Sequence, residues 1–183
     1  MGKLLRTLRS DLLRIRIDDS MRSILSASCF NHSYKCILLY RLHKSLDFKL
    51  LRFVVGGVKR LYQTHCSVFI SPDAEIGEGF AIGHCFSIII SQCKIGKNCT
   101  VMQQVTIGSS RGGTHPGFPT IGNNVFIACG AKIIGNVKIG NNVIIGANAV
   151  VTKDIPDNAI VGGVPAKILN FEGETQTRYW TQN

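Results

Sequence analysis

The 183-residue sequence is poor in acidic residues and has no long apolar run. Its 21 lysines and arginines outnumber 11 aspartates and glutamates, which gives a formal net charge of +10. This excess suits an anionic partner: a phosphorylated cofactor, an anionic lipid or polymer, or nucleic acid. Nucleic acid ranks last, because the basic and aromatic modules of nucleic-acid readers are absent. No stretch approaches the roughly 18 apolar residues of a membrane span, and charges interrupt residues 1–17, so we expect no signal peptide.

The seven cysteines lack a metal-binding or redox spacing. Their number is odd and no two of them are separated by two residues, so a reduced, cytoplasmic protein is expected, with peripheral contact at the inner membrane face left open. A zinc site built from His84, Cys85 and Cys93 would match no standard ligand spacing, and we predict no metal.

Residues 121–151 place an aliphatic side chain at every sixth position. A helix repeats at about 3.6 residues and a half-buried strand at about 2, so neither explains this spacing. A strict period of six is typical of a left-handed parallel β-helix, in which three short rungs make one triangular coil. The fold class is therefore predicted to be mainly β. The repeating positions are Ile121, Ile127, Ile133, Ile139, Ile145 and Val151.

Two further features accompany the repeat. The fourth residue after each aliphatic is small or β-branched and fits an inner corner: Val125, Ala131, Val137, Val143 and Ala149. Glycines follow several of the aliphatics and are expected to supply tight-turn torsions: Gly122, Gly140 and Gly146.

The same spacing extends toward the N-terminus with two interruptions. Four positions keep it, Ile70, Ile76, Ile82 and Ile88, and three resume it one residue late, Ile95, Val101 and Ile107. Ile121 then comes fourteen positions after Ile107, which is not a multiple of six. The segment 109–120 is rich in glycine, proline and hydroxyl side chains. We predict that this segment is a loop leaving the coil, a common position for binding and catalytic residues.

The first 65 residues lack the repeat and are predicted to be helical. Leucines at helical spacing open the chain: Leu4, Leu5, Leu8, Leu12 and Leu13. A second helical stretch covers roughly residues 32–63, with a break or kink expected at Gly56 and Gly57. We favour a cap on the coil or on a sister subunit over a membrane-facing helix, because the apolar stripe is no broader than a core-facing helix needs.

Three regions follow from these patterns. They are a helical region at residues 1–65, a β-helix domain at 66–170 and a polar tail at 171–183. Within the domain the coil itself is expected to span about residues 68–155, with Pro156 at its end.

Residues 68–170 resemble the hexapeptide-repeat acyltransferases, most closely the serine O-acetyltransferase-like branch. The resemblance rests on five stretches: Ile82-Gly83-His84, residues 101–108, His115-Pro116, residues 145–151 and residues 163–167. It implies acetyl-CoA as co-substrate, O-acyl transfer, and a homotrimer or dimer of trimers with active sites between neighbouring coils. Similar short members resemble O-acetyltransferases of surface polysaccharide assembly.

The resemblance also implies roles for individual residues. His84 matches the general base and His115 the second active-site histidine, which positions the acceptor. Imidazole suits the first role because it titrates near neutrality, and a hydroxyl must lose its proton as it attacks a thioester. Cys129 and Ala147 match positions that line the pantetheine arm of CoA. Three lysines are candidates for its phosphates, one of them expected to be a plain solvated charge: Lys132, Lys153 and Lys167.

Three positions depart from the serine acetyltransferases. Gly83 and Thr114 replace an aspartate and an arginine that precede the two histidines, and Phe69 replaces the aspartate that orients the first. A free amino acid needs a carboxylate for its ammonium and a guanidinium for its carboxylate. We therefore expect a sugar hydroxyl of a surface glycan as acceptor, hydrogen-bonded by Gln103, Gln104 and Thr114.

Other interpretations remain. Serine O-acetylation is the alternative acceptor chemistry, and a catalytically inactive coil acting as a scaffold is the alternative outside enzymes. Asp73, Glu75 and Glu78 are candidates to replace the carboxylate lost at Phe69. A carbonic anhydrase-like coil would need three metal-binding histidines, and only His84 and His115 lie within the coil.

Overall fold

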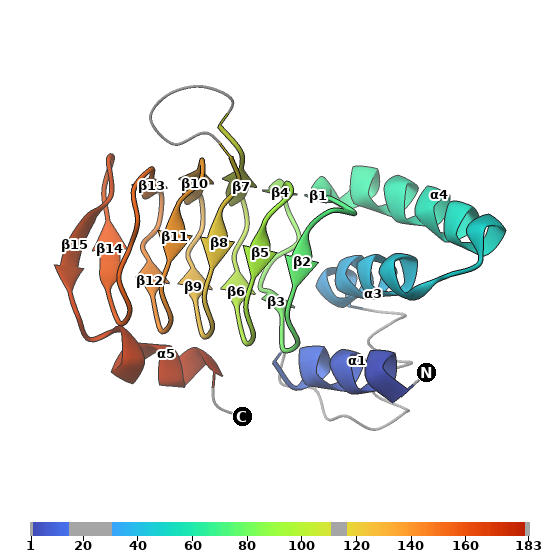
Figure 1. The fold of residues 1–183 in the computed structure, drawn as a ribbon, viewed down its shortest axis with the longest axis horizontal. Helices are drawn as coiled ribbons and strands as arrows, with labels where there is room; N and C mark the ends of the chain where they lie inside the picture. Colours follow the sequence, from blue (N-terminus) through green and yellow to red (C-terminus); the bar gives the residue numbers. More distant parts are fainter. Residues whose placement is uncertain (1, 15–30, 111–116, 182–183) are drawn as a thin grey trace.

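The computed structural model describes residues 2–14, 31–110 and 117–181. These residues form a parallel β-helix with helices packed against its N-terminal end (Figure 1). In the described ranges three sheets make the walls of the coil, and successive coils pair in parallel. The predicted left-handed parallel β-helix with an N-terminal helical region is confirmed.

The three walls are named here in the order in which the chain meets them. Sheet A contains β1 (Val68–Ile70), β4 (Ile88–Ile90), β7 (Thr106–Gly108), β10 (Lys132–Ile134) and β13 (Val150–Val151). Sheet B contains β2 (Glu75–Ile76), β5 (Lys94–Ile95), β8 (Thr120–Ile121) and β11 (Lys138–Ile139). Sheet C contains β3 (Ala81–Ile82), β6 (Thr100–Val101), β9 (Phe126–Ile127), β12 (Ile144–Ile145), β14 (Ile160–Gly162) and β15 (Lys167–Asn170). The turns between them form the A–B, B–C and C–A corners.

The coil does not end at Pro156, as the sequence suggested. β14 pairs in parallel with β12, Ile144 opposite Ile160, so the chain makes a further rung of sheet C. β15 then turns back antiparallel on β14 and covers that edge of the sheet.

The core is a set of aliphatic columns, one for each wall. In sheet A the column runs Ile70, Ile90, Ile107, Ile133 and Val151, all fully buried. Ile90 occupies the position that the simple repeat assigns to Ile88, and Ile88 pairs with Val68 instead.

This register explains the one-residue slip. Ile90 comes eight positions after Ile82, and Ile95 comes five positions after Ile90, whereas the repeat predicts six in both cases. The additional residues belong to the turn 83–87 at the C–A corner. The irregularity in the repeat therefore marks one enlarged turn.

Asparagines form the B–C corner. Asn98, Asn124, Asn142 and Asn158 have φ of 56°, 57°, 55° and 62°, in the left-handed region that asparagine tolerates. Their side-chain amides form a ladder from coil to coil, with N–O distances of 3.3, 2.9 and 2.9 Å. Each turn thus satisfies its polar groups on the next one.

The glycines at this corner have another role than the expected one. Gly122 and Gly140 do not take the left-handed torsion, so the prediction that they supply it is wrong. They permit close approach of successive coils, because a Cβ on Gly122 would lie 2.6 Å from the carbonyl oxygen of Gly140. At the C–A corner, a Cβ on Gly146 would likewise lie 3.0 Å from the carbonyl oxygen of Val161.

The helices are α1 (Gly2–Arg14), α3 (His32–Ser45), α4 (Lys49–Cys66) and α5 (Gly173–Thr181). Asn31 caps α3 by accepting the Tyr34 amide at 2.9 Å, as expected for an N-cap. The predicted break at Gly56 and Gly57 is wrong, since the chain turns at residues 46–48 and both glycines lie inside α4. None of the helices in the described ranges has the length and apolar character that crossing a bilayer requires.

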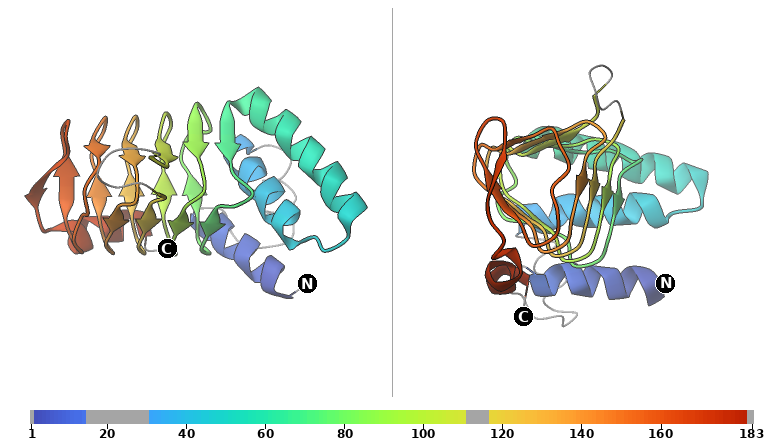
Figure 2. Two further views of the ribbon diagram at one scale, coloured as in Figure 1. Left: turned by 45° about the horizontal axis from the view of Figure 1, so that its top comes forward. Right: turned by 60° about the vertical axis from the view of Figure 1, so that its left-hand side comes forward.

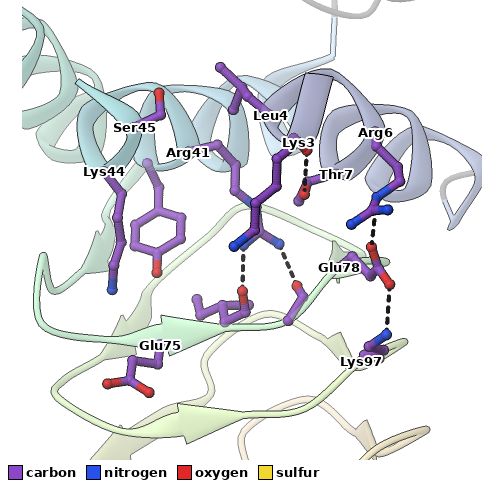
Figure 3. A pocket seen from close by; sticks show the side chains of 13 residues that line it. Lys3, Leu4, Arg6, Thr7, Arg41, Lys44, Ser45, Glu75, Glu78 and Lys97 are labelled. Atoms are coloured by element: carbon purple, nitrogen blue, oxygen red, sulfur yellow. Dashed lines mark hydrogen bonds and ion pairs between the residues drawn. The ribbon is translucent and has the colours of Figure 1, made fainter. Parts of the chain in front are cut away.

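A buried ion pair holds α1 and α3 on the first coil. Arg41 donates to both oxygens of Asp11, at 3.0 and 3.2 Å, and Asp11 accepts the amide of Phe80 at 2.9 Å. Figure 3 shows Arg41 reaching the first coil, where it donates to the carbonyls of Ile76 and Gly77. Such a pair is costly to break, because the surviving charge stays buried.

All three N-terminal helices pack at the first coil, but α4 does so through a different face than predicted. Leu8 and Leu12 of α1 pack on Tyr34 of α3, and Tyr40 of α3 enters the main core. α4 instead turns its apolar stripe to solvent, with Phe53 80% and Leu61 75% exposed.

Substituting alanine at two glycines tests coil packing. Gly122→Ala is expected to lower the free energy of unfolding by about 1–3 kcal/mol, because the added methyl strikes the neighbouring backbone. Gly57→Ala, where nothing lies within 4 Å, should be neutral or stabilising by up to about 1 kcal/mol. Urea titration of both variants measures the difference, and equal stabilities would contradict the packing argument.

Candidate functional site

Three predicted site residues form one column at the C–A corner, and a fourth, His84, lies on the coil before them. The register of sheet C places Val101, Ile127 and Ile145 on successive coils, and the residues two positions later stack in the same order: Gln103, Cys129 and Ala147. His84 follows Ile82 at the start of the enlarged turn, where Phe86 and not His84 makes the backbone hydrogen bond to Gln104 that continues this column. Coils are about 4.8 Å apart, so the turn that carries His84 and Ala147 are about 14 Å apart along the coil.

His84 lies on the enlarged turn 83–87 and is exposed. The backbone of this turn is fixed on both sides. The His84 carbonyl accepts the Phe86 amide at 2.9 Å, and the Phe86 carbonyl accepts the Gln104 amide of the next coil at 2.9 Å. A rigid turn thus presents an accessible imidazole, which is what a general base requires.

Gln103 supplies an unsatisfied acceptor beside His84. Its side-chain oxygen is buried and, among the residues that the structure describes, has no hydrogen-bond partner. An unpaired buried carbonyl is destabilising by about 1–3 kcal/mol, so its presence in this column indicates that a ligand or a proton donor completes it.

The three candidate lysines separate into two groups. Lys132 on the outer face of sheet A donates to the carbonyl of Gln104, next to the column. Lys167 pairs with Gly162 just after the turn that ends the column, and it is exposed. Lys153 follows β13 and lies at the A–B corner, away from the other two.

His115 and Thr114 lie outside the described residues. The base of their loop is described: Ser110 and Gly117 exchange backbone hydrogen bonds of 3.2 and 3.0 Å. The loop leaves between β7 and β8, at the A–B corner. The loop base and His84 are therefore on different corners of the coil.

None of the three candidate carboxylates, all of them in the described ranges, lies at the C–A corner to replace the aspartate absent at Phe69. Phe69 is 49% exposed on the outer face of sheet A, opposite the exposed Ile89. Glu75 lies on sheet B facing Lys94, and Glu78 pairs with Lys97 at 2.8 Å (Figure 3). The third candidate, Asp73, follows β1 at the A–B corner and is exposed.

The glycine before His84 is enclosed by a neighbour. A Cβ on Gly83 would lie 2.4 Å from the sulfur of Met102, on the next coil. Any side chain at position 83, an aspartate included, requires Met102 to move. Met102 thus occupies space that a carboxylate would need.

Thiols from the helices support the turn from behind, a feature that the sequence analysis missed. Burial raises the pKa of Cys85, and the thiol of Cys66 from α4 raises it further, against a lowering hydrogen bond from Ser33. Cys36 of α3 joins this group through Cys66. No spacing rule predicts such a cluster, because it joins three distant segments. Within the described ranges no three His, Cys, Asp or Glu side chains are arranged to hold a metal.

Comparisons with known proteins agree with this geometry. The family model described as bacterial transferase hexapeptide (six repeats) matches residues 118–153. A serine acetyltransferase of Bacillus pumilus is 32% identical over 162 residues, covering 88% of this chain and 75% of the relative. One of Staphylococcus xylosus is 33% identical over 182 residues, covering 94% and 81%. A solved serine acetyltransferase in complex with CoA has a TM-score of 0.77 at 25% identity, over 92% of this chain and 70% of that one.

The thiol cluster makes a prediction about labelling at Cys85. Its raised pKa leaves less thiolate at neutral pH than an ordinary cysteine has, so alkylation should be several-fold slower than in the urea-unfolded chain. The labelling rate should rise toward that of the unfolded chain as pH increases through the raised pKa. Mass spectrometry of the Cys85 peptide measures both rates, and equal rates at neutral pH would show that the thiol is not buried against the helices.

Proposed function

The chain belongs to the serine acetyltransferase family of hexapeptide-repeat transferases. We propose that His84 acts as the general base while acetyl passes from acetyl-CoA to an alcohol oxygen at the C–A corner. Family membership makes the protein an acyltransferase that uses acetyl-CoA. The observation that carries the assignment to this corner is that His84 opens the turn on the coil before the column Gln103, Cys129 and Ala147.

The proposed reaction needs one base and one polarised carbonyl. An imidazole nitrogen of His84 takes the proton of the acceptor hydroxyl as its oxygen attacks the thioester carbon. The tetrahedral intermediate collapses with cleavage of the carbon–sulfur bond, and the imidazolium returns the proton to the CoA thiolate. Gln103 Oε1, left without a partner among the described residues, would accept a hydrogen bond from the acceptor or the imidazole.

The column also suits the CoA arm. Small side chains at Cys129 and Ala147 leave room for pantetheine, whose length matches the roughly 14 Å between His84 and Ala147. Lys132 and Lys167 border the column and are proposed to attract the phosphates. Lys153, at the other corner, is proposed to be a solvated charge.

Free serine is the acceptor that the relatives support, since those of Bacillus pumilus and Staphylococcus xylosus are named for it. This support favours serine over the sugar hydroxyl that the sequence analysis expected. An ammonium and a carboxylate would then have to find partners other than positions 83 and 114.

A sugar hydroxyl is the second candidate, and one structural observation favours it. Met102 fills the space beside Gly83, and the exposed apolar Phe69 stands in place of an aspartate. These features remove negative charge from the C–A corner, which a neutral acceptor tolerates and an ammonium does not.

The test incubates purified protein with acetyl-CoA and either serine or a panel of sugars and nucleotide sugars. Product is followed by mass. His84→Ala is expected to lower kcat by about 10²–10⁴-fold, because the base acts during attack. The KM for acetyl-CoA should change little, since His84 lies on the coil before the column. Full activity in the variant would remove His84 from the role, and turnover of serine or of a sugar decides the acceptor.

We further propose that the working unit is a homotrimer with sites shared between chains. His84 lies at the C–A corner and the loop carrying His115 leaves at the A–B corner. Sheet A separates them and exposes Phe69 and Ile89, while Phe118 near the loop base is 42% exposed. A neighbouring chain packed there would cover this apolar surface and bring its own loop toward His84.

Mixing two inactive variants tests the shared site. If His84 and His115 of one site come from different chains, unfolding and refolding His84→Ala with His115→Ala should restore activity. With random assembly, about a quarter of the sites would hold both histidines. Each variant refolded alone is the control. No recovery from a mixture shown to contain both chains in one oligomer would place both histidines in a single chain.

A further inference from the structure

α4 is amphipathic, but its polar face contacts the coil and its apolar face is exposed to solvent. Apart from Cys66 at its end, its buried side chains are polar: Lys59 and Gln63 are 5% and 6% exposed, and both donate to the carbonyl of Ile70, at 3.3 and 3.4 Å. Its large apolar side chains are exposed. They are Leu50, Leu51, Phe53, Val54, Val58 and Leu61, from 47% to 80% exposed, with Phe48 just before the helix at 67%.

These apolar residues share one face. At about 3.6 residues per turn, Leu50, Val54 and Leu61 align, with Phe53 and Val58 on either side. Lys59 and Gln63 fall on the opposite face, toward the coil. Figures 1 and 2 show α4 at the N-terminal end of the molecule, with α3 and β1 on one side and no other described element over its outer side. An apolar stripe of this size that is exposed to solvent indicates a binding face.

Lys49 and Arg60 border the apolar face, whereas Arg52, seven residues before Lys59, lies on the opposite face, toward α3. Lys49, Arg52 and Arg60 line a groove of about 600 Å³ together with His43 and Phe53. α3 and α4 contain no acidic residue, and Asp47 in the turn between them is the nearest acid in sequence. Burial lowers the pKa of His43, and the nearby charges of Lys59 and Arg52 lower it further, as expected in a cationic groove.

We propose that α4 docks the protein on a membrane surface rich in anionic lipid. The apolar face, defined here as Leu50, Phe53, Val54 and Leu61, enters the boundary between headgroups and acyl chains. Lys49 and Arg60, at the border of that face, bind lipid phosphates. The helix lies in the plane of the surface and does not span it.

Charge decides between this occupant and a second copy of the chain. A two-fold contact would place the same surface on both sides, so the cations of one α4 would face those of the other. No carboxylate on α3 or α4 is available to neutralise them. Anionic headgroups supply that neutralisation, which makes a lipid surface the better match.

Vesicle flotation tests the proposal with the full chain. We expect flotation with phosphatidylcholine vesicles that contain phosphatidylglycerol and little with phosphatidylcholine alone. Leu61→Ser should weaken binding about tenfold, because one buried apolar side chain is lost from the interface. Lys49→Gln with Arg60→Gln should weaken it as well and reduce its dependence on salt.

The matched control is Leu169→Ser, which removes a leucine 67% exposed on β15 at the other end of the coil and should float like the parent. Circular dichroism and acetyl transfer in solution verify that each variant is folded, independently of lipid. The proposal is overturned if the parent floats with neither vesicle. It is also overturned if Leu61→Ser binds normally while its mass in sedimentation falls, since α4 would then join two chains.

Discussion

Superposition of each coil on the one before is the constraint on which this structure depends. Backbone hydrogen bonds run from coil to coil along every wall, so a residue's environment is set by its counterparts one coil before and after. Aliphatic columns inside and the asparagine ladder at the B–C corner are consequences of this stacking. So is the site: Gln103, Cys129 and Ala147 align because the rungs before them are in register, and His84 opens the enlarged turn on the coil before them.

The ends of such a stack need protection, since open sheet edges invite pairing with other chains. β15 closes sheet C at one end by running antiparallel. At the other end, α3 and α4 cover the first coil, and the buried Asp11–Arg41 pair ties α1 and α3 to its backbone. The same helices contact the C–A corner, where Cys66 of α4 lies beside Cys85. Stability at the N-terminal end and the position of the His84 turn therefore depend on the same helices.

How far the sequence predicted this arrangement differs by residue. The six-residue period predicted the fold and the inward columns, because one coil repeats the environment of the last. It misassigned Ile88, since the enlarged turn 83–87 can be located only from strand pairing. It also assumed that the stripe on α4 faces inward: periodicity shows that a helix has an apolar face, but not where that face points. Gly83 and Met102 are in contact but lie on adjacent coils, so their contact leaves no pattern along the chain.

The two surfaces proposed for binding are close in the fold, and this bears on the acceptor. α4 ends at Cys66, whose thiol lies against Cys85, the residue after His84. A chain docked through α4 would thus hold its catalytic turn near the lipid surface. An acceptor carried on a membrane lipid would be concentrated there by its anchor, and it would not need the ion pairs by which an enzyme captures a free amino acid from solution. The neutral environment around Gly83, Met102 and Phe69 is compatible with such an acceptor, so lipid binding by α4 would strengthen the sugar candidate relative to serine.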